Sequence, residues 1–167
     1  MARAKYQFED FLTTVSNDYK DFVVDVHKML LQEKYRPKIS ITKSTGFQLA
    51  YHQPQIKTTA GIILIIFKRK EKLMIRLYGK NHKQYLDELN DLPEQLVSQI
   101  EKADNCVKFT NPDKCWKGCL GYEFQIRENL YQKCMVNCFE FQMETLSTPA
   151  FLTLIESESK ARFWCEI

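Results

Sequence analysis

The sequence predicts a single α+β domain in which helices pack on one face of an antiparallel sheet. Three observations lead to this fold class. Apolar residues recur at helical spacing over 6–35, 81–103 and 147–163. Residues 38–78 and 121–143 instead show the alternating or β-branched patterns that are typical of strands. Finally, a chain of 167 residues is long enough to bury one core without disulfide bonds, so we expect one domain over 1–167.

The N-terminal half predicts a helix followed by a four-stranded meander. The helical segment 6–35 allows a break near Ser16, and it ends at 34–37 because a proline disfavours a helical residue before it. Residues 38–43 and 46–52 form a hairpin around the turn 44–46. Residues 58–67 are almost continuously apolar, which indicates a central strand. After the charged turn 68–72, residues 73–78 pair back.

The C-terminal half predicts helices, two more strands and a closing helix. Residues 81–103 favour two short helices joined at 90–92, with Pro93 at the start of the second. Two strands are expected at 121–126 and 131–143, around a turn at 127–129. Residues 147–163 predict the last helix, with Thr148 and Pro149 at its entrance.

Composition and charge narrow the class of protein. The net charge of +3 is too small to indicate nucleic-acid binding by itself. The N-terminal segment has no apolar signal region, and the longest apolar run, 61–67, is far shorter than a membrane span. We therefore expect a cytoplasmic protein that does not bind or cross a membrane. In that compartment six cysteines are more typical of reduced thiols or metal ligands than of a disulfide framework.

A cysteine-rich segment at 104–143 holds five of the six cysteines: Cys106, Cys115, Cys119, Cys134 and Cys138. Zinc requires about four thiolate or imidazole ligands in a tetrahedron. Cys115 and Cys119 lie in a polar loop, Cys106 precedes this loop and Cys134 lies on the strand that returns past it. We therefore predict a structural zinc site made by these four residues, which would leave no open coordination position for catalysis.

Cys138 is the candidate fifth ligand. Four residues along an extended strand span about 13 Å, which is too far for Cys134 and Cys138 to share one metal. A bulge near Asn137 would bring Cys138 closer. Cys165 ranks after all the others. The competing interpretation is that the cysteines are reduced and simply packed in the core or exposed in loops.

A thiol-dependent redox or metal-handling protein is the alternative function. Such a thiol needs a lowered pKa from a nearby cation or a helix N-terminus. Lys114, Lys117 and Lys133 lie next to cysteines in the sequence or close to them. The chain has no C-x-x-C motif, so exchange of the thioredoxin type is not expected.

No motif indicates an enzyme. The sequence has no glycine-rich phosphate loop, no HExxH and no GxSxG, and the three histidines, His27, His52 and His82, are scattered. We therefore expect a non-enzymatic domain that binds a small molecule or a protein partner. Arg76 and Tyr78 are candidate ligand-binding residues, because Arg76 faces out of a strand where it could hold an anionic group.

The densest basic region, 68–83, carries lysines and arginines with interleaved tyrosines, which is also the pattern of a weak nucleic-acid surface. The simpler interpretation is a solvated hairpin tip whose lysines keep a sheet edge soluble. The simpler interpretation is favoured, and nucleic-acid binding is the third candidate function.

The pattern FTNPDKC (109–115), GY (121–122), YQKC (131–134) and CFEF (138–141) resembles a family of small uncharacterised bacterial proteins. The resemblance covers most of the chain from Phe8 to Ala161 and implies no established activity. The helix–meander–helix order from Phe8 to Ala103 is more distantly similar to the YdhG-like proteins, whose fold resembles frataxin. This similarity implies a fold and not a function.

Overall fold

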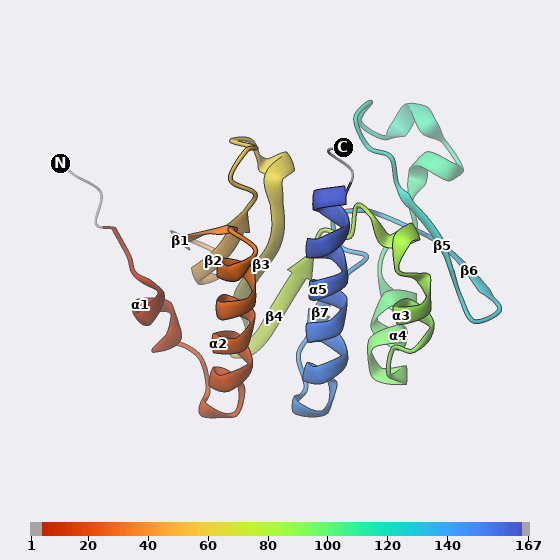
Figure 1. The fold of residues 1–167 in the computed structure, drawn as a ribbon. Helices are drawn as coiled ribbons and strands as arrows, with labels where there is room; N and C mark the ends of the chain where they lie inside the picture. The colour runs from red at the N-terminus through yellow and green to blue at the C-terminus, as the bar shows by residue number, and fades with distance from the viewer. Residues whose placement is uncertain (1–4, 165–167) are drawn as a thin grey trace. The chain divides into compact units, whose positions relative to one another are not determined.

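The computed structural model describes residues 5–164 and confirms the α+β class (Figure 1). Five strands form an antiparallel sheet in the order β1-β2-β3-β4-β7, and β5 and β6 form a separate two-stranded sheet. The elements are α1 (Phe8–Leu12), α2 (Asn17–Gln32), β1 (Arg36–Thr42), β2 (Gly46–His52), β3 (Ile62–Arg69), β4 (Lys72–Leu77), α3 (Leu86–Asn90), α4 (Glu94–Lys102), β5 (Tyr122–Ile126), β6 (Asn129–Lys133), β7 (Glu140–Gln142) and α5 (Thr148–Trp164).

The chain forms two compact units. Unit 1 comprises residues 5–75 and 142–148, and unit 2 comprises residues 76–141 and 149–164. The cysteine-rich segment 104–143 therefore belongs to unit 2 except for its last two residues. Among residues 5–164, no helix combines the length and the apolar character that crossing a membrane requires.

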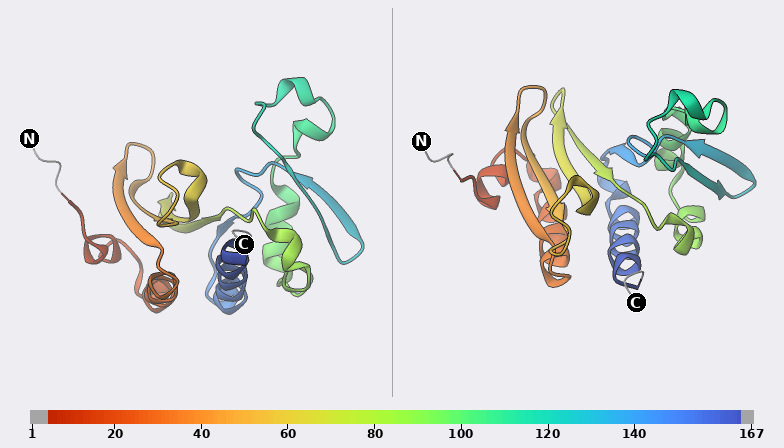
Figure 2. Two further views of the ribbon diagram at one scale, coloured as in Figure 1. Left: turned by 45° about the horizontal axis from the view of Figure 1, so that its top comes forward. Right: turned by 90° about the horizontal axis from the view of Figure 1, so that it is seen from above.

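Unit 1 is built from two helices and the β1–β4 meander. The predicted break near Ser16 is present, because α1 ends at Leu12 and α2 begins at Asn17. One face of α2 is buried, and its residues are Phe22, Val23, Val26 and Leu30. The first hairpin forms around the predicted 44–46 turn, and β1, β2 and β3 lie side by side (Figure 2).

The predicted start of the central strand is wrong by four residues. A 3-10 turn occupies Thr59–Gly61, and the strand begins at Ile62. Gly61 packs so closely on Ile56 that a Cβ atom at Gly61 would lie 2.8 Å from the Ile56 Cβ. The strand preference of Thr58 and Thr59 is therefore overridden by a close backbone approach that only glycine at position 61 allows.

Unit 2 contains α3, α4, α5 and the β5–β6 hairpin, and α3 packs against β5. The prediction of one long strand over 131–143 is wrong. Strand β6 ends at Lys133, and β7 begins at Glu140. Between them the Cys138 N–H donates to the Cys134 carbonyl at 2.9 Å, which is a single helical turn. This turn, and not a bulge near Asn137, switches the face on which the apolar side chains lie.

The core of unit 2 includes a buried ion pair that the sequence analysis did not anticipate. Glu158 and Arg162 lie one turn apart on α5, with the Arg162 Nε donating to the Glu158 Oε1 at 2.9 Å. The Tyr85 hydroxyl donates to the same carboxylate at 2.6 Å, and the Arg162 Nη2 donates to the Tyr78 carbonyl at 2.7 Å. Hydrogen bonds to both charges offset the cost of burying them.

Candidate functional site

The cysteine loop, defined here as residues 104–121, is anchored by the buried side chain of Lys133. The Lys133 Nζ donates to the carbonyls of Glu101 and Ala103 at 2.8 Å each, and to the Asn105 Oδ1 at 3.0 Å. All three ammonium protons therefore have acceptors. Because the carbonyls lie at the C-terminal end of α4, the positive charge also complements the helix dipole.

The backbone next to Lys133 brings two cysteines onto neighbouring segments of the chain. Asn105 and Lys133 form an isolated antiparallel bridge. On its two sides, the Cys106 N–H donates to the Gln132 carbonyl at 2.9 Å and the Cys134 N–H donates to the Asp104 carbonyl at 3.0 Å. Cys134 therefore returns past the start of the loop, as the sequence predicts.

The loop then closes back on Cys106 through two short 3-10 turns, Val107–Phe109 and Pro112–Lys114. The Lys108 ammonium donates to the Cys119 carbonyl and so ties the two ends of the loop. Gly121 has φ +65°, and a Cβ there would lie 2.9 Å from the Cys106 Sγ and 2.8 Å from the Phe109 ring. Glycine is needed here both for its backbone conformation and for this contact.

Three cysteines of this loop have thiols near enough to influence one another electrostatically, and we call them the thiol cluster: Cys106, Cys115 and Cys119. Cys106 and Cys119 are buried, whereas Cys115 is half-buried. Desolvation, a hydrogen bond with the Cys119 thiol and the proximity of the Cys119 and Cys106 thiols raise the pKa of Cys115. The cluster thus contains one half-buried thiol whose pKa is influenced by two buried thiols near it.

Cys134 and Cys138 form a second group. The helical turn between them places their thiols close enough to interact electrostatically. Cys138 is 1% exposed, and burial raises the pKa of its thiol well above the ordinary value, against the opposing positive charge of Lys133. From its place in the sequence, Lys133 is a candidate cation for lowering the pKa of a nearby thiol. At Cys138, burial raises the pKa by more than the charge of Lys133 lowers it.

The four predicted zinc ligands are therefore divided between the two groups, three in the thiol cluster and Cys134 beside Cys138. Within residues 5–164, no three or more His, Cys, Asp or Glu side chains are grouped so that they could hold a metal ion. The structural zinc site stays a prediction, and Cys165 lies outside the described residues.

Arg76 and Tyr78 do lie together, as predicted, but Arg76 already has an anionic partner. The Arg76 Nε donates to the Glu140 Oε2 at 2.7 Å. Burial lowers the pKa of Arg76, but hydrogen bonds to Tyr78 and Glu140 outweigh that effect and raise it. In the fold, the Glu140 carboxylate therefore pairs with Arg76, where the sequence predicts the anionic group of a ligand.

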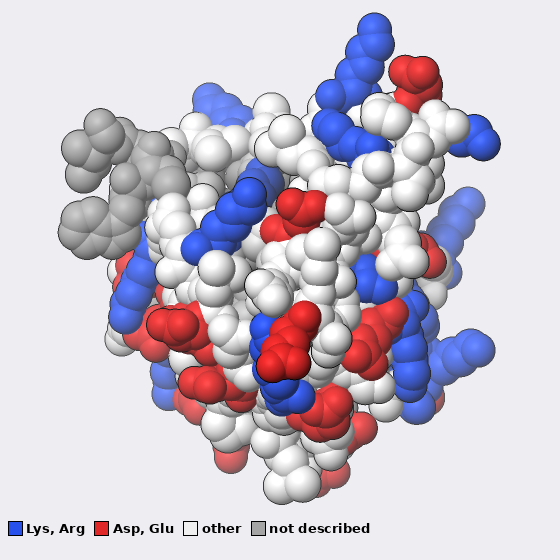
Figure 3. Space-filling view, turned by 90° about the vertical axis from the view of Figure 1, so that its right-hand side faces the viewer, with Lys and Arg blue, Asp and Glu red and all other residues white. Residues whose placement is uncertain are grey.

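The cations of the basic region 68–83 are divided between the two units, because residues 68–75 belong to unit 1 and residues 76–83 to unit 2. His82 is buried, with its Nδ1 2.8 Å from the Gly79 carbonyl oxygen. Arg76 is paired with Glu140, so the accessible cations of unit 1 in this region lie at the tip of the β3–β4 hairpin. On the face of unit 2 that carries α3, α4, β5 and β6, acidic and basic side chains are interspersed (Figure 3). This face does not form the single-sign surface that nucleic-acid binding favours.

Exposed apolar side chains concentrate in the cysteine loop. Among the described residues, four of the ten large hydrophobic side chains that are exposed lie between 107 and 120: Val107, Phe109, Trp116 and Leu120. Trp116 is 64% exposed, and its indole lies over Gly118. A cluster of this kind is typical of a surface that contacts another molecule. In the sequence, the signal for such a surface is Trp116, which lies between Cys115 and Cys119. Tryptophan is not a metal ligand, so a prediction based on metal ligands does not include it.

Comparisons with known protein families, with curated proteins and with solved structures found nothing that matches this chain. The resemblances given in the sequence analysis therefore stay predictions.

Proposed function

We propose that this chain is a binding domain whose cysteine loop responds to thiol oxidation, with Cys115 and Cys119 forming a reversible disulfide. The observation that carries this proposal is the nearness of these two thiols, one half-buried and the other buried, which is close enough for the Cys119 thiol to raise the pKa of Cys115. Because three residues in a loop separate them, a movement of that loop is enough to bring their sulfurs to bonding distance.

The oxidant in this scheme is a small disulfide such as oxidised glutathione. The thiolate of Cys115, the more accessible residue, attacks one sulfur of the oxidant and releases one reduced thiol. Because the pKa of Cys115 is raised and not lowered, little thiolate is present at neutral pH, so this step is slow there and becomes faster as the pH rises. The Cys119 thiolate then attacks the mixed disulfide at Cys115 and releases the second reduced thiol. The protein loses two protons and two electrons, which the two released thiols carry away.

Oxidation would alter the surface that binds a partner. Trp116 and Gly118 lie between the two cysteines, and the indole of Trp116 is packed on Gly118. Pulling Cys115 and Cys119 together constrains this five-residue turn and moves Trp116, the largest exposed apolar side chain of the loop. The proposed function is therefore partner binding that depends on the redox state of this pair.

The test is to incubate the full chain with oxidised glutathione, block the remaining thiols and map the products by mass spectrometry. The expected product has lost two hydrogens and carries a Cys115–Cys119 bond. Cys134→Ser should give the same product. Cys119→Ser should stop at a glutathione adduct on Cys115. A bond that joins other cysteines, or no intramolecular bond at all, would refute the proposal.

Elemental analysis of the same protein, purified without chelator, tests the zinc prediction in parallel. Near one zinc per chain that protects Cys106, Cys115, Cys119 and Cys134 from alkylation would favour the structural metal site. Alkylation of Cys115 in metal-free protein, with its fold retained, would favour the dithiol instead.

A further inference from the structure

Unit 1 contains a cavity that the cysteine site does not involve. It has a volume of about 340 Å³, at the lower end of the range for small-molecule sites. Three separate segments of unit 1 line it: the link between α1 and α2 with the first turn of α2, the tip of the β3–β4 hairpin, and residues 142–143 at the end of β7. A cavity bounded by distant segments of the chain is fixed by the fold of the unit and not by one flexible loop.

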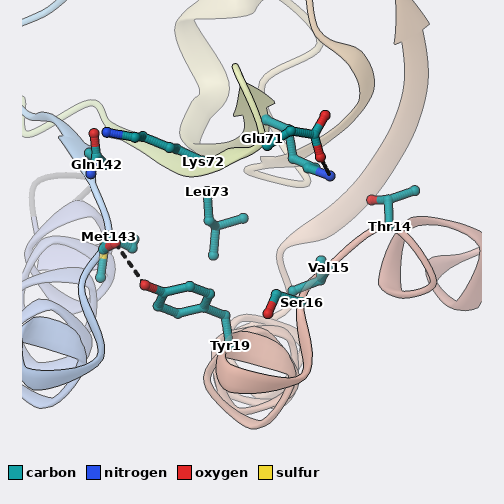
Figure 4. A pocket seen from close by; sticks show the side chains of 10 residues that line it. Thr14, Val15, Ser16, Tyr19, Glu71, Lys72, Leu73, Gln142 and Met143 are labelled. Atoms are coloured by element: carbon teal, nitrogen blue, oxygen red, sulfur yellow. Dashed lines mark hydrogen bonds and ion pairs between the residues drawn. The ribbon is translucent and has the colours of Figure 1, made fainter.

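The lining has an apolar floor and a polar rim (Figure 4). Val15, Leu73 and Met143 are buried, and Leu73 points between the rim residues toward Tyr19. On the rim, the Lys72 side chain runs toward Gln142. The Tyr19 hydroxyl donates to the Met143 carbonyl at 3.0 Å, which keeps the tyrosine ring along one wall.

The charge of the lining is positive. Glu71 is the one carboxylate among the ten lining residues, and the Lys68 Nζ lies 2.9 Å from its Oε2. Lys72 is exposed and, among the residues described, makes no ion pair or hydrogen bond. A neighbouring hollow shares Thr14, Lys68 and Glu71 and adds Lys70, which extends the positive character along the hairpin tip.

The hairpin turn itself supports a role for these side chains. Lys70 and Glu71 have φ +49° and +63°, in the left-handed region. A two-residue turn with both φ values positive favours Asn-Gly, because other side chains are strained there. This chain keeps a lysine and a glutamate at the two positions, and both line one of the hollows.

We infer that this cavity binds a small organic anion. The anionic group lies at the Lys72 ammonium, next to Gln142, and the apolar body of the ligand lies on Leu73 and Met143 against the Tyr19 ring. A negative charge matches the unpaired lysine, whereas the buried floor requires an apolar portion that an inorganic ion lacks. The inference concerns unit 1 and does not depend on the redox proposal for the cysteine loop.

The experiment uses the full chain labelled with ¹⁵N and three probes: benzoate, phenyl phosphate and the uncharged benzamide. Backbone amide shifts are followed by NMR during titration. Benzoate or phenyl phosphate should give saturable shifts at residues 14–19, 68–73 and 142–143, with a Kd of about 1 mM for a ligand of this size. Benzamide should bind about tenfold more weakly. Comparison of the two anions shows whether the site prefers a carboxylate or a phosphate.

Two matched variants assign the effect to one charge. Lys72→Gln should weaken benzoate binding about five- to tenfold and leave benzamide unchanged, whereas Lys28→Gln, the same substitution at an exposed position of α2, should change neither. The NMR spectra show directly whether each variant is folded.

Three results would overturn the inference: no saturable shift with either anion, equal affinity for benzoate and benzamide, or unchanged benzoate binding in Lys72→Gln. A single-stranded oligonucleotide that binds the hairpin tip more tightly than benzoate, with strong salt dependence, would also overturn it and assign the lysines to nucleic acid.

Discussion

The two cysteine pairs of unit 2 have the same spacing in the sequence and opposite environments in the fold. Cys115 and Cys119 lie in a loop, with the Cys115 thiol half-buried and the Cys119 thiol buried near it. Cys134 and Cys138 lie on a helical turn between β6 and β7, with Cys138 fully buried. Spacing therefore determines how far apart two cysteines lie, whereas burial determines whether they can react.

The comparison also explains why a search by spacing predicts one zinc site. In the sequence, Cys115 and Cys119 lie near enough to share one metal, and Cys134 is expected to return past their loop. The bridge at Asn105 and Lys133 does bring the two segments near each other. In the fold, Cys138 is buried, and Lys133 anchors the start of the cysteine loop.

The largest expected effect comes from removing that anchor. Lys133→Met leaves the carbonyls of Glu101 and Ala103 and the Asn105 Oδ1 without their donor, which should lower the free energy of unfolding by about 2–4 kcal/mol. Urea denaturation measures the change. Lys102→Met, at an exposed position nearby, should cost less than about 0.5 kcal/mol. Equal costs for the two variants would show that Lys133 does not hold the loop.

The next largest expected effect is a difference in stability between serine variants of the two cysteine pairs. Cys138→Ser places a hydroxyl in an apolar environment and should cost about 1–3 kcal/mol. Cys115→Ser, at a half-buried loop position, should stay within about 0.5 kcal/mol. Thermal and urea unfolding of both variants test this. If Cys115→Ser were the more damaging change, the contrast drawn between the pairs would be wrong.

A smaller effect is the dependence of stability on pH. Because burial raises the pKa of Cys138 in the folded protein, its thiol stays protonated at pH values where the thiol of the unfolded chain, with a pKa of about 8.5, has ionised. The contribution is fully present below about pH 8.5 and is lost as the pH rises toward the folded-state pKa, by at most about 1.4 kcal/mol per pH unit.

Urea unfolding of the wild-type protein and of Cys138→Ala between about pH 7 and 9 measures this loss, below the range in which tyrosines of the unfolded chain, with a pKa of about 10, ionise. The wild-type protein should lose stability more steeply than the variant. Cys115→Ala should remove a smaller part of the slope, because its pKa is raised less markedly. Parallel curves for the wild-type protein and Cys138→Ala would contradict the burial of that thiol.

The smallest effect tests the packing of the exposed loop. A Cβ at Gly118 would lie 1.9 Å from the Trp116 ring, so Gly118→Ala must displace the indole. The emission maximum of Trp116 should shift, with a change in stability under about 0.5 kcal/mol because the side chain is mostly exposed. Trp116→Phe identifies which part of the signal belongs to this residue. An unchanged spectrum would mean that the indole does not lie on Gly118.

Local patterns predicted most of the elements. The hairpin at 44–46, the two short helices around Pro93 and the closing helix all formed where turn residues and apolar spacing placed them. The failures have one cause in common. At Gly61 the backbone packs on Ile56, and at residues 134–138 it forms a helical turn, so in both places a turn of the backbone overrides a preference of the side chains for strand.

The sequence by itself determined the α+β class, the position of the cysteine loop and the nearness of Cys115 to Cys119, because these depend on periodicity and on separations of a few residues. Only the tertiary structure decided that Arg76 is paired with Glu140, that Lys133 is buried as an anchor and that residues 14–19, 68–73 and 142–143 enclose a cavity. Charge pairing, burial and cavities depend on which distant residues meet, and that information arises only when the chain folds.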